Sequence, residues 1–350
     1  MSETDIEALL EQGYQLEEEE RYSDALALYE QALTAEPGNA EAWYHKGDAL
    51  FSLERYNEAL PAYDRSIALD PSDSLAWAGK GNALFALERN SDALAAYEKA
   101  IELDRTDASP WLYKGIALFD MDESEQALAA FTRATELDPT LPDAWSGKGD
   151  ALSDLERGEE ALAAYDRALD LDPDHVESWL GKGDTLSDLD DPLAALEAYD
   201  RVLAIESLNA DGHIGRGDAL ETMDRHDEAL DAFERAIQLD SENARAWAGK
   251  AVALSSLDRN DEALTAFDKA IALDDEDELL WLFKANTLHI LDRPEDALAA
   301  YNRATELDPD FGWAWQGKAH VLRELGRSAE AADAQRHADE LDEDDDADDE

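Results

Sequence analysis

The sequence predicts an all-α protein, an α-α superhelix (solenoid) of ten 34-residue helical hairpins. Three observations support this fold class. Tryptophan recurs every 34 residues, at Trp43, Trp77, Trp111, Trp145 and Trp179 and again at Trp247, Trp281 and Trp315, with His213 in the gap. When that tryptophan is counted as position 4 of a repeat, position 11 is Leu and position 20 is Ala in all ten copies. No insertion or deletion interrupts the series, so one supersecondary unit is repeated along the chain.

The first predicted helix of each repeat, helix A, covers about positions 1–14. Positions 4, 8 and 11 lie on one face of a helix with 3.6 residues per turn. Position 8 is Gly seven times and Ala three times, which lets a second helix approach closely. Pro142 stands at position 1, where its missing N–H costs nothing. The repeats start at residues 6, 40, 74, 108, 142, 176, 210, 244, 278 and 312.

The second predicted helix, helix B, covers about positions 17–30. Positions 20, 24 and 27 share a face, and position 24 is Tyr or Phe in nine repeats. Pro192 and Pro294 stand at position 17, the favoured place for proline at a helix start. Pro61 falls at position 22, inside helix B of the second repeat. Because an interior proline removes a hydrogen bond and clashes with the preceding turn, we expect this helix to bend or to begin late, near residues 57–61.

Most of the basic residues fall at positions 7, 16 and 26 of the repeat. Position 16 is Arg in eight repeats, just past helix A, and acids such as Glu58 stand at position 19 in the first turn of helix B. Both placements complement the helix dipoles, so these charges are predicted to support the scaffold. Position 7 is Lys or Arg in nine repeats. Its methylenes are expected to cover the position-4 tryptophan while the charged end reaches a carboxylate.

These positions resemble the tetratricopeptide repeat family, whose pattern is W-x2-L-G-x2-Y, then A-x3-F, then P. The chain matches with Trp at position 4, Gly at 8, Ala at 20 and an aromatic at 24. Position 32 is proline at Pro37, Pro71, Pro139, Pro173 and Pro309. The resemblance covers residues 6–345 and implies a right-handed superhelix whose concave surface is lined by helix A. Position 7 departs from the family, which usually has Leu there.

The acidic composition limits the classes of partner and indicates the salt concentration in which the protein works. Asp and Glu number 86 against 29 Lys and Arg, a formal net charge of −57. Such a surface repels phosphate backbones and anionic lipids, so neither nucleic acid nor membrane is an expected partner. The excess of Asp and scarcity of Lys resemble haloarchaeal proteins, in which molar salt screens the repulsion. Since Met1 to Ile6 lacks the bases of a secretory signal and no apolar run is long enough for a membrane helix, a cytoplasmic location is expected.

Both ends of the array are predicted to cap the solenoid. In the last repeat Gln335 replaces the aromatic at position 24 and Asp339 replaces the aliphatic at position 28. A polar final helix is what a terminal repeat requires. The chain from Leu341 onward is predicted to be an acidic, disordered tail that ends with residues 346–350.

Motifs that carry chemistry are absent or incomplete, so we expect no enzyme activity, no cofactor and no metal site. Gly79-Lys80-Gly81 lacks the spacing of a phosphate-binding loop and lies inside helix A. Asp170, Asp172 and Asp174 imitate the start of a calcium loop, but His175 stands at the sixth position, where that loop needs Gly. The seven histidines form no H-E-x-x-H, and there is no cysteine.

The family resemblance implies a partner-binding groove along helix A positions 2, 5, 9, 12 and 13. Two apolar zones are expected to flank an acidic middle, and exposed aromatics often mark contact sites. The alternative is that these side chains pack against neighbouring A helices. The predicted groove residues are Tyr44, Phe51, Phe85, Leu112, Ile116 and Phe119 in one zone, Asp150, Asp184 and Asp218 in the middle, and Leu282, Ile290 and Trp313 in the other zone.

The predicted function is therefore a monomeric, non-catalytic scaffold that binds extended or helical segments of other proteins. The alternative is an accessory subunit of an enzyme or of a secretion or assembly complex whose catalyst is on another chain. The sequence does not identify the partner.

Overall fold

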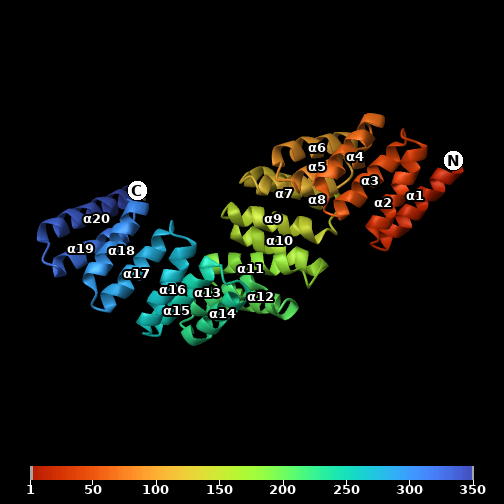
Figure 1. Cartoon of the computed structure of the whole chain (residues 1–350). Helices are drawn as coiled ribbons and strands as arrows, with labels where there is room; N and C mark the ends of the chain where they lie inside the picture. Colours follow the sequence, from red (N-terminus) through yellow and green to blue (C-terminus); the bar gives the residue numbers. More distant parts are fainter. Residues whose placement is uncertain (1–2, 349–350) are drawn as a thin grey trace. The chain divides into compact units, whose positions relative to one another are not determined.

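The computed structural model describes residues 3–348, which form helices and turns with no strand. The chain forms two compact units, residues 1–181 and residues 182–350. The division falls within α11 (Val176–Asp188). Figure 1 shows the order of the helices along the chain.

The first unit contains five helical hairpins, each made of an A helix followed by a B helix. Its helices are α1 (Glu3–Glu18), α2 (Tyr22–Ala35), α3 (Ala40–Ser52), α4 (Tyr56–Leu69), α5 (Ser74–Phe85), α6 (Asn90–Leu103), α7 (Ser109–Phe119), α8 (Ser124–Leu137), α9 (Pro142–Asp154) and α10 (Gly158–Leu171).

The second unit continues the same alternation of A and B helices. Its helices are α12 (Pro192–Ile205), α13 (Ala210–Thr222), α14 (His226–Leu239), α15 (Ala244–Ser256), α16 (Asn260–Leu273), α17 (Glu278–Ile290), α18 (Pro294–Leu307), α19 (Gly312–Glu324) and α20 (Ser328–Asp348). Across residues 3–348 the twenty helices make ten hairpins, which confirms the predicted all-α solenoid class.

Within each unit the A helices lie next to one another. Helices that lie wholly within one unit pack against the next helix of that unit, and most of their A helices also contact the following A helix, as α3 contacts α5 and α15 contacts α17. Side chains from successive A helices therefore share one surface, which we call the A-helix face.

In the first nine hairpins the core centres on the ring at position 24, and the ring of Phe131 is held between two glycines. Phe131 is 2% exposed. A Cβ added to Gly115, at position 8 of the same repeat, would lie 2.7 Å from this ring, and one added to Gly147, at position 6 of the next repeat, would lie 2.5 Å from it. The sequence predicted the small residue at position 8 as a close-approach site, and this is confirmed. The matching role of position 6 was not predicted.

The turn between the two helices of a hairpin uses the same conformation in every repeat. Position 15 has a positive φ of 56–59° at nine acidic residues and 72° at Gly326. The N–H after it returns to the helix, as from Arg55 to the carbonyl of Leu50 at 2.9 Å. Arg55 also pairs with Glu58 at 2.8 Å, and the equivalent pair recurs at other repeats. The predicted scaffold role of positions 16 and 19 is thus confirmed.

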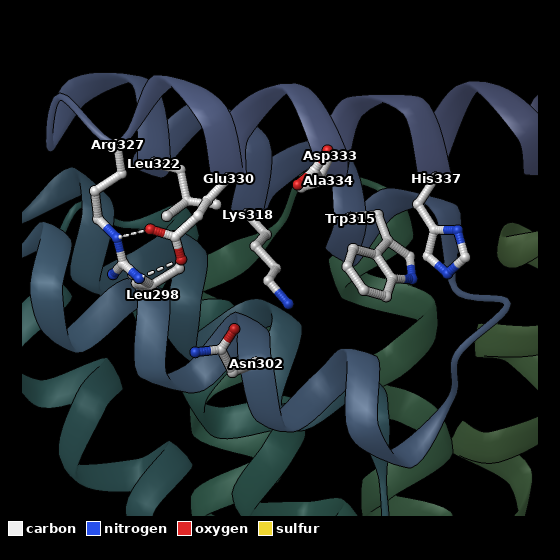
Figure 2. Close-up of a pocket in the computed structure, with 10 residues that line it drawn as sticks. All are labelled: Leu298, Asn302, Trp315, Lys318, Leu322, Arg327, Glu330, Asp333, Ala334 and His337. Atoms are coloured by element: carbon white, nitrogen blue, oxygen red, sulfur yellow. Dashed lines mark hydrogen bonds and ion pairs between the residues drawn. The ribbon is translucent and has the colours of Figure 1, made fainter.

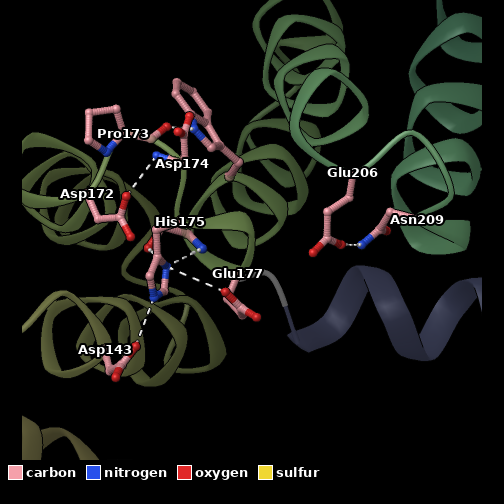
Figure 3. A network of polar contacts seen from close by, with 10 residues as sticks. Asp143, Asp172, Pro173, Asp174, His175, Glu177, Glu206 and Asn209 are labelled. Carbon is pink, nitrogen blue, oxygen red and sulfur yellow. Dashed lines mark hydrogen bonds and ion pairs between the residues drawn. The ribbon is translucent and has the colours of Figure 1, made fainter. Parts of the chain in front are cut away.

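The turn between repeats is fixed by the tryptophan and by a cap on the next A helix. Trp179 Nε1 donates to the carbonyl oxygen of Pro173 at 3.0 Å. His175 occupies the cap position of α11, where its Nδ1 accepts the Ser178 N–H at 3.2 Å and its Nε2 lies 2.9 Å from Asp143 Oδ1 (Figure 3). The histidine that interrupts the calcium-loop pattern is therefore a helix cap.

The position-7 lysines take the predicted position over the tryptophans. Lys46 Nζ lies 5.6 Å from the ring centre of Trp43 and 2.8 Å from Glu30 Oε1 on the preceding B helix. Equivalent ion pairs to position 25 of the preceding repeat are Lys80 to Asp64, Lys114 to Glu98, Arg216 to Asp200, Lys250 to Glu234 and Lys284 to Asp268. These cations therefore join consecutive repeats.

The expected late start of the second B helix is wrong. Helix α4 begins at Tyr56, the same repeat position as in other B helices, and continues past Pro61. The proline is exposed, while Ala62 and Tyr63 beside it are 1% exposed. Burial of these side chains stabilises the helical conformation against a proline penalty of roughly 3 kcal/mol.

At the carboxyl end, α20 is described as far as Asp348, and residues 349–350 of the predicted tail lie outside the described residues. Among the described helices, none combines the length and apolar character needed to cross a bilayer.

Candidate partner-binding surface

In the first unit, the predicted groove residues are mostly half-buried. Tyr44 and Phe51 pack against the core around Tyr63, and Phe85 packs beside Leu84. Ile116 and Phe119 pack on the core around Phe131, and Leu112 is only 6% exposed. Leu112 is therefore a core residue, and its prediction as a surface contact is wrong. Its neighbour Tyr113, at position 6, is exposed instead.

In the second unit, two predicted residues are among the most exposed apolar side chains. Trp313 is 72% exposed and Ile290 is 64% exposed. Leu282 is 8% exposed and belongs to the core, so its prediction as a groove contact is wrong. The adjacent Phe283, again at position 6, is 40% exposed.

The polar residues at position 9 are mostly tied to the ring at position 24 of the same repeat. In five repeats where that ring is Tyr, its hydroxyl donates to an Asp or Asn at position 9. The pairs are Tyr63 to Asp48 at 2.7 Å, Tyr97 to Asn82 at 3.0 Å, Tyr165 to Asp150 at 2.8 Å, Tyr199 to Asp184 at 2.6 Å and Tyr301 to Asn286 at 2.5 Å. Asp150 in the first unit and Asp184 in the second therefore satisfy a buried hydroxyl.

Asp218 departs from this pairing. The ring of its repeat is Phe233, which has no hydroxyl, and the other phenylalanine repeats have apolar Ile116 and Val252 at position 9. Asp218 instead accepts from Arg245 at 2.7 Å, and Arg245 is the only basic residue at position 2 of any repeat. Burial raises the pKa of the Asp218 carboxyl, and the arginine opposes this shift. Because Phe233 has no hydroxyl, no buried donor of the core depends on Asp218.

The Asp218–Arg245 pair borders a cavity of about 230 Å³ on the A-helix face of the second unit. Val252 and Phe283 form part of its apolar lining, beside Leu279, which is 44% exposed. The residues come from α13, α15 and α17, with the Phe233 ring behind them. The cavity thus combines apolar side chains with one arginine and several carboxylates.

Glu221 adds an unpaired acceptor to this cavity. Its Oε1 accepts the Ser256 hydroxyl at 2.7 Å and lies 2.9 Å from His226 Nδ1. Its Oε2 is buried and has no hydrogen-bond partner. Leaving a buried carboxylate oxygen unpaired is unfavourable.

Sequence reasoning missed the exposed rings at position 6. Tyr113 and Phe283 are aromatic residues at that position, and each ring stacks on the position-24 ring of the preceding repeat. Phe283 lies 6.5 Å from Phe267, and Tyr113 lies 6.3 Å from Tyr97, each at 20°. The departure from a small residue in the repeat alignment is the signal that identifies these residues.

A second cavity, of about 400 Å³, lies near the C-terminal end of the second unit. Lys318 lies over Trp315 at 4.2 Å, but position 25 of the preceding repeat is Asn302 where most repeats have an acid. Figure 2 shows the lysine between Asn302 and the α20 residues Asp333 and His337. Burial lowers the pKa of the Lys318 ammonium. The equivalent cavities around Lys80 and Lys284 have a carboxylate at position 25, Asp64 and Asp268, where this cavity has Asn302.

Replacement of Asp48 by Asn is expected to stabilise the first unit at neutral pH by about 1–2 kcal/mol. Burial raises the pKa of the Asp48 carboxyl from 3.8 to about 6. Because of this raised pKa, the folded state binds more protons than the unfolded state between these two values. The free energy of unfolding therefore falls as pH rises from about 4 to about 6 and stays at the lower value above pH 6. The amide oxygen of the new asparagine would still accept from Tyr63, as Asn82 does from Tyr97.

Urea unfolding at several pH values measures this effect. The difference in unfolding free energy between Asp48→Asn and the parent chain should be largest above pH 6 and shrink toward pH 4. The matched control is Asp120→Asn, an exposed acid of the first unit outside the ion pairs that join the repeats, which should show no such pH window. A constant difference at all pH values would contradict the assignment.

The comparisons with known proteins agree with this architecture. Four sequence models described as tetratricopeptide repeat match the chain, over residues 10–74, 46–110, 112–176, 146–211, 180–244, 220–287, 279–321 and 314–345. None of the curated proteins compared with the chain matches it in sequence.

Two solved structures show the same fold. One is the APC/C hetero-tetramer Cut9-Hcn1, with a TM-score of 0.63 and 18% identity over 87% of this chain and 60% of that chain. The other is a tetratricopeptide repeat protein from Parabacteroides merdae ATCC 43184, with a TM-score of 0.57 and 14% identity over 71% of this chain and 98% of that chain. This chain thus spans less than two thirds of the first structure's length, and at these identities the likeness concerns the fold.

Proposed function

The chain belongs to the tetratricopeptide repeat family, and we propose that it is a non-catalytic scaffold that binds segments of other proteins on its A-helix faces. The observation that carries this proposal is the cavity bounded by Asp218, Arg245 and Phe283, with exposed Ile290 and Trp313 on α17 and α19. Groups of exposed apolar side chains on one face often mark a surface that binds a partner.

The chemistry of the surface favours a partner with a basic residue next to an apolar anchor. Three carboxylates, Asp218, Glu221 and Asp277, line the cavity against one arginine. A Lys or Arg of the partner would pair with the carboxylates that line the cavity, while an apolar side chain packs on Leu279 and Phe283. In the first unit the proposed contacts are Tyr44, Phe51, Phe85, Ile116 and Phe119, with Asp150 as an acidic neighbour; in the second unit Asp184 is the acidic neighbour.

We place this scaffold in a cytoplasm at molar salt, as a monomer and without a cofactor. The formal net charge of −57 supports the high-salt setting. The alternative remains an accessory subunit of an enzyme or of a secretion or assembly complex whose catalyst is on another chain. In both cases the apolar anchors provide most of the affinity, because molar salt shortens the Debye length to about 3 Å and suppresses long-range attraction.

Truncation of the exposed anchors is expected to weaken partner binding by more than about 2 kcal/mol, roughly 30-fold. The test is affinity purification at molar KCl with the parent chain, followed by a dissociation constant for the captured partner's binding segment. Trp313→Ala and Phe283→Ala should each cause this loss. Phe85→Ala should weaken binding by the first unit, whereas Asp184→Asn should have almost no effect, since an asparagine there still accepts from Tyr199.

The matched control is Leu193→Ala. Leu193 is 57% exposed, lies in the same unit and is on a B helix. This variant should bind like the parent chain. If Trp313→Ala and Phe283→Ala keep full affinity with the fold preserved, binding does not use the A-helix face.

A further inference from the structure

Two histidines and one glutamate meet on the A-helix face of the second unit, outside the cavity bordered by Asp218 and Arg245. His289 is in the last turn of α17, and His320 and Glu324 are one turn apart on α19. His289 Nε2 lies 3.0 Å from Glu324 Oε2, and His320 Nε2 lies 3.4 Å from Glu324 Oε1. The two imidazole rings meet edge to face at 5.1 Å.

The ligand atoms of these three side chains all lie within 4.8 Å of one another, the one such group of three among the described residues. A zinc ion with ligands at about 2.1 Å places them about 3.4 Å apart at the corners of a tetrahedron. The separations of 3.0 and 3.4 Å, which join the two imidazoles to different oxygens of Glu324, are close to this value. Small rotamer changes therefore suffice to enclose an ion.

The chemistry of the donors selects the class of metal. Imidazole nitrogens suit Zn²⁺ and neighbouring first-row ions, whereas Mg²⁺ and Ca²⁺ prefer oxygen ligands. The helices that carry the donors pack directly on each other, so the geometry is fixed by the scaffold. Neither imidazole is needed for the core, since the side chains of His289, His320 and Glu324 are 31, 57 and 46% exposed.

We propose that His289, His320 and Glu324 form a binding site for one divalent transition-metal ion, with Zn²⁺ as the best fit. Three protein ligands leave a fourth coordination position open to solvent. The site stands on the same face as Ile290 and Trp313, so a bound ion would offer a partner a coordination position beside the apolar anchors. The proposal does not depend on partner binding, because the site is complete within this chain.

Isothermal titration of the full chain with Zn²⁺ in molar KCl tests this site. Excess Mg²⁺ is included to occupy the many surface carboxylates. The parent chain is expected to bind one equivalent of Zn²⁺, and His289→Ala, His320→Ala and Glu324→Gln should each lower the affinity at least about tenfold. The matched control is His337→Ala, because His337 lies 3.8 Å from a single carboxylate, Glu340, without a second histidine.

A second measurement needs no variant. Zn²⁺ should protect His289 and His320 from modification by diethylpyrocarbonate, as read by mass spectrometry, and should leave His337 reactive. The proposal is overturned if the parent chain binds no stoichiometric Zn²⁺ above the Mg²⁺-masked background. It is equally overturned if the three variants bind like the parent chain or if neither histidine is protected.

Discussion

The protein is expected to lose most of its helical circular dichroism when KCl is lowered from molar concentration to about 10 mM. Acids exceed bases by 57 charges, and the Debye length grows from about 3 Å to about 30 Å over this range. The ion pairs at positions 16 and 19 are exposed, as the 45 and 60% exposure of Arg55 and Glu58 shows, so each contributes little to stability. They cannot offset the repulsion among the remaining acids.

Two controls separate screening from other effects of salt. Sucrose at matched osmolality favours compact states without screening charge and should restore little helicity. MgCl₂ at low concentration should restore more than KCl of the same molarity, since a divalent ion screens more strongly. Full helicity at about 10 mM KCl would contradict the adaptation to high salt.

Gly147→Ala is expected to destabilise the first unit by about 3 kcal/mol, the upper part of the range for overpacked cores. Helix propensity alone predicts the opposite sign, because alanine is favoured over glycine inside a helix by up to about 1 kcal/mol. The new Cβ would lie 2.5 Å from both Cε1 and Cζ of Phe131, whose other side is bounded by Gly115. With glycines on both sides the ring has nowhere to move, so the clash outweighs the gain.

Thermal and urea unfolding in molar KCl measure this destabilisation. Gly38→Ala is the matched control, because an added Cβ there has nothing within 4 Å. The smaller side chain of Phe131→Leu should recover part of the loss when combined with Gly147→Ala. Equal stability of Gly147→Ala and the parent chain would show that α8 and α9 separate easily, contrary to the packing described.

The sequence by itself determined the period, the helices and the core positions. Helix α4 was predicted at positions 17–30 and spans Tyr56–Leu69, without the late start expected from Pro61. This success has a physical reason: each repeat contacts mainly its neighbours, so a pattern of 34 residues encodes the packing locally. The family resemblance, and with it the proposal of a partner-binding role, also follows from these repeated positions.

Part of the candidate surface is encoded in the sequence itself. The pairing of Tyr at position 24 with Asp or Asn at position 9, and the mismatch of Phe233 with Asp218, can be found by comparing the ten repeats. The exposed ring of Phe283 is likewise marked by the loss of a small residue at position 6. Positions 5 and 6 differ by about 100° around the helix, which separates a buried Leu282 at the predicted position 5 from an exposed Phe283 at position 6.

Only the tertiary structure decided which side chains meet across neighbouring A helices. Arg245 reaches Asp218 from the next repeat, and His289 meets His320 and Glu324 in the same way. These residues stand at different repeat positions, 2 and 9 in the first case and 12, 9 and 13 in the second, so no motif of fixed spacing connects them. Their meeting depends on the distance and rotation between adjacent A helices, which the small residues around each position-24 ring set through packing.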